Sequence, residues 1–472
     1  MSAAGLLGFA VLALLLTAVG SGLARLLGLP RRGAAHGAVF AVLAGLLAWH
    51  LLLQISTLLG IPWSRPALAA ALLLLLWLSR RLARQSAAEG PRPCPPPLAP
   101  GWGDGAAAFA ILSLGLLAPS LWITLPDFVY HWGLKGEHAF LTRGIDYAWL
   151  AEPWNWSLHP DYPHLLPILY GSTSILAGRF DASALQLWSV LFLAATVLAV
   201  RAALAQPGLS RGAVQGGVAW VGLATAAYSI GYLLAGGADG IMALALAAAL
   251  PALLSPLEPG AEAEIGLAAG FAAAGKIEGV PLAGALLGVH LLRRLPGLLR
   301  QPEERRGFPP AVLKLLGPTL ALALPWYLAA HRYHLFQATN SGPFDFRRGA
   351  AILSAAVEAA NAPELHGLPW LTALLPLAWL TRRTRPLAAV ATAQLAVYLW
   401  VYFASVLEVR FYVLSNFARL LFQLLPAVLV GVVVAFAPGE GRRGCPPEAG
   451  KTEGEGCREA STEQTARPVE QV

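Results

Sequence analysis

Long apolar runs recur along this chain, and they constrain its fold more than any other feature of the sequence. A helix needs about twenty mainly apolar residues to cross the hydrocarbon core of a bilayer. Runs of that length or slightly shorter lie at 2–24, 36–58, 66–79, 106–125, 184–202, 212–234, 240–255, 311–330, 367–381, 386–404 and 418–437. Only 12% of the 472 residues are charged, about half the share that is usual in soluble domains. We therefore expect an all-α fold, a polytopic bundle of transmembrane helices.

Residues 264–292, "EIGLAAGFAAAGKIEGVPLAGALLGVHLL", decide how many helices the bundle holds. They could form one long span or two short helices broken at "GKIEG". A single span would place Arg201 and Arg211 outside the cell, against the usual retention of Lys and Arg on the cytoplasmic side. We therefore expect two helices here and about thirteen transmembrane helices in all.

Lys and Arg gather in short clusters between the apolar runs, at 25–32, 80–92, 201–211, 293–306, 382–385 and after 438. Cytoplasmic loops carry such an excess, so the clusters predict a multi-pass membrane protein that starts outside and ends inside. Because the basic residues lie between apolar runs, we attribute the net charge of +7 to membrane topology and expect no nucleic-acid partner. The three cysteines then face the cytoplasm, where disulfides are rare: Cys94, Cys445 and Cys457.

Four segments follow from this arrangement. Residues 1–80 are expected to form an N-terminal three-helix membrane segment, whose first run lacks the basic start of a signal peptide. Residues 81–104 are rich in Pro and Arg and predict a cytoplasmic linker. Residues 105–437 hold the main membrane domain, and the polar tail 438–472 predicts a disordered cytoplasmic segment.

The longest loops on the expected outer face are residues 126–183 and 331–366. In the first, polar side chains follow an apolar run directly in "PDFVYHWGLKGEH" and recur in "HPDYP". Its candidate site residues are Asp127, His131, Lys135, His159, Asp161 and Tyr162. Residues 159–178 predict a re-entrant or surface helix, with a cavity behind Asp127. The many tryptophans and histidines fit an aromatic belt at the membrane surface, and equally a groove that packs on sugar or lipid.

Ionisable side chains also stand at the ends of other expected helices, where they are costly unless paired or solvated. They are Asp239 in "GGADG", Lys276 and Glu278 in "GKIEG", and Arg332, Arg410 and Arg419. Asp239 is also suited to be the first residue of a helix, where the helix dipole favours a negative charge. Lys276 and Glu278 are also suited to form a purely structural ion pair. The three arginines could bind an anionic phosphate group. Each is also suited to lie at the membrane interface with its side chain extended to the lipid headgroups.

Cofactor motifs are weak. "GFAAAGKI", residues 270–277, has the spacing of a nucleotide-binding phosphate loop up to its Lys, but Ile277 stands where Ser or Thr would hold magnesium. Prolines among His159, Asp161 and His164 do not suit a metal site. We expect no cofactor, and the sequence gives no support for a divalent metal.

In order and spacing, "PDF", "YHWGLKGEHAFLTRG", "HPDYPHLLPILYGSTS", "GGADGIMALALAAAL" and "GKIEGVPLAGALL" resemble the bacterial GT-C superfamily of integral membrane glycosyltransferases, over residues 105–437. The pattern is related to that of aminoarabinose transferases and protein O-mannosyltransferases. The resemblance implies inverting transfer of a sugar from a polyprenyl-phosphate lipid to a glycan, lipid or protein acceptor on the outer face of a bacterial inner membrane. It also implies outer-face surface helices in the first large loop.

The resemblance implies roles for single residues as well. Asp127 matches the family's catalytic base, and Asp239 its second acidic loop position. Lys135 and "HPDYP" match the first-loop motif, and "KIEG" matches a motif that is often K-N-E-G, with Ile277 in place of the polar residue. Residues 2–79 precede the family's usual first helix. The single acid of "PDF" stands where many members have two.

Two other functions fit the same chain. A transporter or flippase of lipid-linked sugars would use the cavity without a base, and a non-catalytic scaffold for envelope assembly would use the outer loop as a partner surface. Transporters typically have repeat symmetry and discontinuous helices at the bilayer midplane, whereas the acids of this chain stand near the expected outer surface. We therefore expect an enzyme, a glycosyltransferase.

Overall fold

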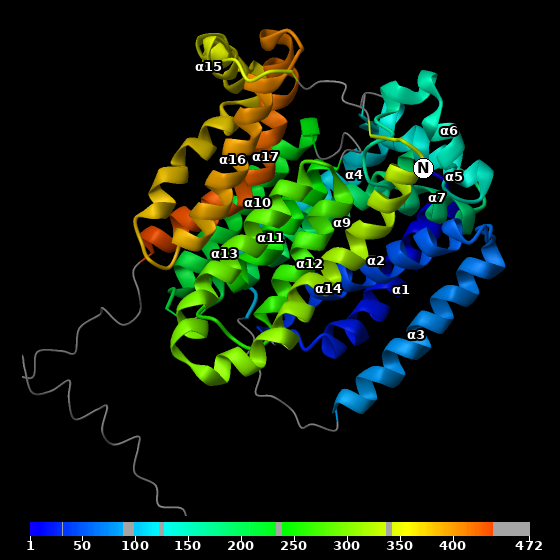
Figure 1. Cartoon of the computed structure of the whole chain (residues 1–472), viewed down its shortest axis with the longest axis horizontal. Coiled ribbons are helices and arrows are strands. Elements are labelled where there is room, and N and C mark those ends of the chain that lie inside the picture. Colours follow the sequence, from blue (N-terminus) through cyan, green and yellow to red (C-terminus); the bar gives the residue numbers. More distant parts are fainter. Residues whose placement is uncertain are drawn as a thin grey trace, which may run out of the picture.

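The computed structural model describes residues 1–30, 32–87, 99–121, 127–206, 208–232, 238–336 and 342–437. Within these ranges every regular element is a helix, and nine helices are long and apolar enough to cross a membrane. The chain is therefore an all-helical, multi-pass membrane protein, as its apolar runs predict (Figure 1).

The α-helices are α1 (Ala3–Leu26), α2 (Ala34–Leu58), α3 (Arg65–Ala87), α4 (Trp102–Leu121), α5 (Gly133–Thr142), α6 (Tyr147–Ala151), α7 (Leu165–Ala177), α8 (Ala182–Leu185), α9 (Leu187–Leu204), α10 (Arg211–Tyr232), α11 (Asp239–Leu254), α12 (Ala261–Gly275), α13 (Gly279–Arg300), α14 (Pro302–Arg332), α15 (Gly349–Ala360), α16 (Arg385–Ala404) and α17 (Val409–Phe436). The other helices are the π-helix η2 (Phe128–Trp132) and the 3₁₀ helices η3 (Pro153–Leu158), η4 (Phe346–Arg348), η5 (Pro363–Leu365) and η6 (Leu368–Trp379).

Some helices differ at their ends from the apolar runs that predict them. α17 begins at Val409, before the run at 418–437, because the Glu408 carboxylate caps its first turn by accepting from the Arg410 and Phe411 backbone N–H groups. The run at 367–381 forms the 3₁₀ helix η6, which holds Pro369 and Pro376, and each proline removes a backbone donor that an α-helix would use.

The expected linker, residues 81–104, is helical at both of its ends. α3 continues to Ala87, so Arg80, Arg81 and Arg84 lie on a helix, and α4 already begins at Trp102. The middle of the linker, residues 88–98, and the tail 438–472 lie outside the described residues.

Residues 264–292 fold as two antiparallel helices, α12 and α13, as the sequence predicts. Glu262 in the first turn of α12 forms an ion pair with Arg294 near the end of α13. At the other end of the pair, a Cβ on Gly279 would lie 1.9 Å from the Ala272 carbonyl oxygen. Glycine therefore allows the two helices to meet closely, and the turn between them carries Lys276 and Glu278.

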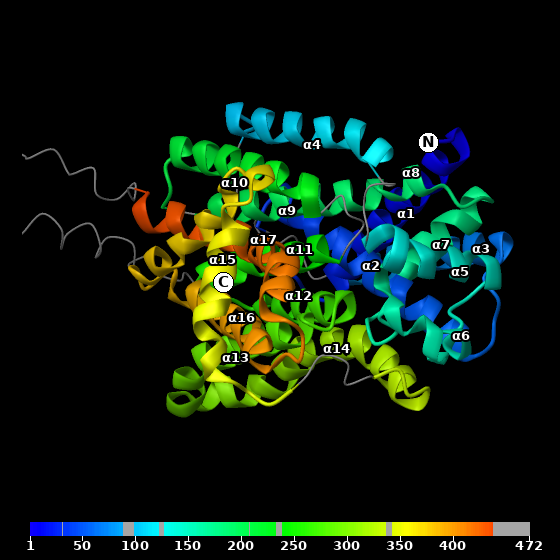
Figure 2. The same ribbon diagram turned by 90° about the horizontal axis from the view of Figure 1, so that it is seen from above.

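The N-terminal helices are packed into the bundle. α1 and α2 cross at glycines, since a Cβ on Gly45 would lie 1.9 Å from the Leu16 carbonyl oxygen. α2 also contacts α9 and α14, and Arg32 just before α2 binds Glu258 at 3.0 Å and Glu264 at 3.1 Å. Figure 2 shows α4 along an edge of the molecule next to α10, and the outward side chains of α4 include the exposed Leu116.

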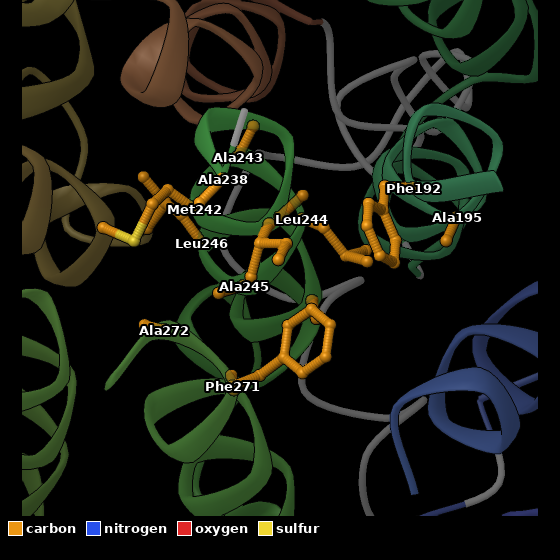
Figure 3. Packing of buried hydrophobic residues seen from close by; sticks show 14 of the residues in the cluster. Phe192, Ala195, Ala238, Met242, Ala243, Leu244, Ala245, Leu246, Phe271 and Ala272 are labelled. Carbon is orange, nitrogen blue, oxygen red and sulfur yellow. The ribbon is translucent and has the colours of Figure 1, made fainter. Parts of the chain in front are cut away.

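The centre of the bundle is α11, in which every residue is buried. Its alanines allow α9, α12 and α17 to approach closely, and Figure 3 shows Phe192 of α9 and Phe271 of α12 on the side of α11 that carries Leu244. The two phenylalanine rings meet edge to face with centroids 6.2 Å apart. This packing holds α11 rigidly, and with it the side chain of its first residue, Asp239.

Candidate functional site

Arg419 of α17 joins two of the predicted acids. Its Nη2 lies 2.5 Å and its Nη1 3.3 Å from the two Asp127 carboxylate oxygens. Its Nε lies 3.0 Å from Asp239 Oδ2. The Arg419 guanidinium therefore joins Asp127 and Asp239, which precede it in the sequence by 292 and 180 residues. Its planar geometry fixes the orientation of the Asp127 carboxylate.

Asp239 is the buried centre of this network. It is 1% exposed and opens α11, where the N-terminal end of the helix dipole favours a negative charge. Besides Arg419, it accepts from Lys276 Nζ at 3.1 Å and from Gln423 Nε2 at 2.5 Å. These three donors compensate the negative charge of the Asp239 carboxylate, as a buried carboxylate requires.

Lys276 and Glu278 extend the network to the turn between α12 and α13. Lys276 Nζ lies 3.3 Å from Glu278 Oε1, which also accepts from the Tyr162 hydroxyl at 3.2 Å. Glu278 Oε2 is buried and has no hydrogen-bond partner among the residues that the structure describes. Lys276 and Glu278 thus form an ion pair, and Glu278 Oε2 is an acceptor atom open to a further donor.

Asp127 is positioned by the π-helix that follows it. η2 begins at Phe128, whose buried ring packs on Tyr170 of α7 with centroids 5.5 Å apart. Single π-turns are rare and occur often at functional sites. This turn sets Asp127 and His131 on one side, where both line the same cavity.

Aromatic rings form one wall of the site. Tyr162 stacks between Trp132 and His159, with centroid distances of 5.7 Å and 4.9 Å, and His131 meets His159 edge to face at 5.0 Å. Burial lowers the pKa of His131, and burial, together with the nearby Lys135 and Lys276 charges, lowers the pKa of His159 to about 4. Both imidazoles are therefore neutral at pH 7 and can donate and accept hydrogen bonds.

Lys135 and Asp161 lie behind this wall. Lys135 Nζ donates to the His159 carbonyl at 3.0 Å and lies 4.5 Å from the centre of the Trp132 ring. Burial lowers the Lys135 pKa to about 7 and raises the pKa of Asp161. Neither residue lines the cavity, so they support the loop that carries His159 and Tyr162.

The cavity has a volume of about 230 Å³. Its polar floor and aromatic wall are Asp127, His131, Trp132, His159, Tyr162, Lys276, Glu278 and Arg419. Its other side comes from α16, α17 and the loop between them, through Tyr398, Val401, Leu407, Phe411, Tyr412, Ser415, Asn416 and Leu420. A polar pocket bordered by apolar side chains suits a ligand with a sugar or phosphate group and a hydrocarbon part.

Two predicted arginines lie elsewhere. Arg410 forms an exposed ion pair with Glu358 of α15 at 2.6 Å. Arg332, at the end of α14, lies over the ring of Tyr333 at 5.7 Å. Both are surface residues, and the cavity that Arg419 and Lys276 line includes neither of them.

Several lining residues were missed by sequence reasoning, and α17 carries the signal that could have found them. Asn416, Arg419 and Gln423 recur at helical spacing within an otherwise apolar stretch, so they share one face of the helix. Asn416 and Arg419 line the cavity, and Gln423 holds Asp239 beneath it. Tyr398 and Tyr412 give no such signal, because tyrosines are common near membrane surfaces.

The charges of the site show what it can bind. Asp127, Asp239 and Glu278 are three carboxylates against the two cations Lys276 and Arg419, a sum of −1 when all five are ionised. Free lone pairs on Asp127 and Glu278 can accept from hydroxyl groups. Within the described ranges, no group of three or more His, Cys, Asp or Glu side chains is arranged to hold a metal ion. Comparisons with protein-family models, curated proteins and solved structures find no match to this chain.

Proposed function

We propose that the chain is a membrane glycosyltransferase that moves a sugar from a polyprenyl-phosphate donor to an acceptor hydroxyl on the outer face of a bacterial inner membrane. The observation that carries the proposal is the convergence of Asp127, Lys276, Glu278 and Arg419 on one cavity. Acids and bases from separate parts of the sequence meet there beside apolar side chains of α16 and α17. The sequence resemblance to GT-C glycosyltransferases supports the same conclusion.

Asp127 is the general base in this proposal. The acceptor oxygen attacks the anomeric carbon, its proton passes to an Asp127 oxygen, and the bond from the anomeric carbon to the phosphate oxygen breaks. The polyprenyl phosphate leaves with that electron pair, and attack opposite the leaving group inverts the anomeric centre. Arg419 binds both carboxylate oxygens of Asp127, and lone pairs remain on each oxygen to accept the proton.

Lys276 and Arg419 stabilise the phosphate in this proposal. Negative charge gathers on the leaving group as the bond breaks, and positive groups in a partly dehydrated site stabilise it strongly. Both cations are paired with carboxylates, so the phosphate binds as a further partner at their remaining N–H groups. Tyr162 and Trp132 offer flat faces to the sugar ring, and neutral His131 and His159 hydrogen-bond its hydroxyls.

The decisive experiment replaces Asp127 with Asn. Asn keeps the size and much of the hydrogen bonding of Asp but takes up no proton, and loss of a general base typically lowers the rate by a factor of about 10² to 10⁴. Turnover of labelled polyprenyl-phosphate sugars is measured per folded molecule in nanodiscs, beside a melting curve. Glu137→Gln is the matched control, since Glu137 lies on α5 outside the cavity.

The outcomes separate the proposed functions. Normal turnover in a folded Asp127→Asn protein would eliminate Asp127 as the base. Movement of lipid-linked sugar across the membrane without a new glycosidic bond, in wild type and variant alike, would favour the transporter or flippase. No conversion and no transport of the labelled lipids would favour the scaffold.

A further inference from the structure

A second cavity lies between α1 and α3, far from Asp127. Ser2 at the start of α1 donates to Asp181, which lies with Asp127 in the loop of residues 126–183. The second cavity adjoins the other end of α1. Its volume is about 360 Å³, and it is lined by Ala18, Ser21, Gly22, Arg25, Arg80, Ala83 and Arg84. The two helices touch beside it, since a Cβ on Gly22 would lie 2.6 Å from the Ser79 carbonyl oxygen.

Three arginines give this cavity a strong positive charge. Arg80 and Arg84 stand four residues apart on α3 and share one face of the helix, and Arg25 lies in the last turn of α1. In the described part of the chain, none of the three guanidinium groups pairs with a carboxylate. All three arginines are exposed, so water screens part of their mutual repulsion, and an anion between them would remove more of it.

Several arginines in other expected cytoplasmic loops have partners within the described residues. Arg32 binds Glu258 and Glu264, and Arg294 binds Glu262. Arg383 donates to the Leu254 carbonyl and to Gln206. Arg25, Arg80 and Arg84 differ from these arginines in that they line one common cavity while no carboxylate of the described residues pairs with them.

We propose that the second cavity binds a phosphate group, namely that of an acidic phospholipid headgroup. Guanidinium groups match phosphate oxygens in geometry and charge. Lipid tails would lie directly beside the cavity, because α1 and α3 are both long and apolar enough to span the membrane and expose Leu14 and Leu73 to its interior. Basic pockets between transmembrane helices on the cytoplasmic side take such headgroups. This site is independent of the proposed sugar transfer.

The test uses the full chain in zwitterionic detergent and short-chain phosphatidylglycerol as the probe. The concentration that gives half of the maximal rise in melting temperature is compared for wild type, the Arg80→Gln/Arg84→Gln variant and Arg81→Gln. Arg81 is the matched control, because it is adjacent on α3 but lies over the Trp77 ring outside the cavity. Each basic residue contributes about 1 kcal/mol to anionic-lipid binding, so the double variant should bind about thirtyfold more weakly and Arg81→Gln nearly as wild type.

A further variant and a second ligand complete the experiment. Ser21 is exposed and lines the cavity, so Ser21→Trp fills the hollow without a change in charge and must also weaken binding; it decides the matter if the double variant does not fold. Unchanged binding in the double variant, or an equal loss in Arg81→Gln, would overturn the site. Inorganic phosphate that stabilises the protein as strongly as phosphatidylglycerol would overturn the lipid source and assign free phosphate to the cavity.

Discussion

At the scale of single residues, Asp239 shows how a charge is kept inside a membrane bundle. The sequence identified it as an acid between glycines at a helix end, which suited a ligand site, the second acidic position of the GT-C pattern, or a helix N-terminus stabilised by the helix dipole. The structure shows three donors around it, from Lys276, Arg419 and Gln423. These donors come from two other elements, so the sequence around Asp239 carries no information about them.

Removal of the Asp239 carboxylate should therefore destabilise the fold. Asp239→Ala leaves Gln423 Nε2 without its acceptor and removes one of the two carboxylates that pair with the buried Lys276, and breaking such a network typically costs about 3–5 kcal/mol. Asp239→Asn keeps an acceptor oxygen and should cost less. Denaturant unfolding of both variants in detergent measures the difference. An alanine variant within about 1 kcal/mol of wild type would mean that water replaces the carboxylate without penalty.

At the scale of elements, the helices were largely predictable and their neighbours were not. Runs of about twenty apolar residues mark spanning helices because a bilayer leaves few other solutions, and the two helices of 264–292 followed from the positions of Arg201 and Arg211. The polar face of α17 was also readable. Its contact with Asp127 was not, because the apolar faces of neighbouring helices are chemically alike and do not specify which helices pack together.

The α12–α13 pair gives a prediction at this scale. Gly279→Ala puts a Cβ against the Ala272 carbonyl oxygen, which should force the helices apart, cost about 1–3 kcal/mol, and displace Lys276 and Glu278. Gly284→Ala on the same helix meets open space and should stabilise it by up to about 1 kcal/mol. Melting curves of the two variants measure the contrast. A Gly279→Ala protein as stable as Gly284→Ala would show that the close approach is not needed.

At the scale of the whole molecule, the charged networks lie at opposite ends of the bundle. The network of Asp127, Asp239 and Lys276 gathers where α11 and α13 begin. Arg294 with Glu262 and Arg32 with Glu264 gather where α12 begins and α13 ends. The sequence predicted that Asp127, Asp239 and Lys276 lie on one side of the membrane and the basic clusters at 25–32 and 293–306 on the other, since basic loops stay in the cytoplasm. It did not predict which arginines are paired, because the partners come from distant loops.

Membrane sidedness is the last prediction, and it follows from this separation. α6 and α15 lie at one end of the bundle and the connection from α13 to α14 at the other (Figure 1). In a protein whose three cysteines are replaced by Ser, single cysteines at the exposed Thr142 and Phe346 should react with a membrane-impermeant maleimide on intact cells. Cysteines at the exposed Arg211 and Gln301 should react only after permeabilisation, because these positions lie in the basic loops. The opposite pattern would place Asp127 on the cytoplasmic side, where nucleotide sugars are available and a lipid-linked donor is not required.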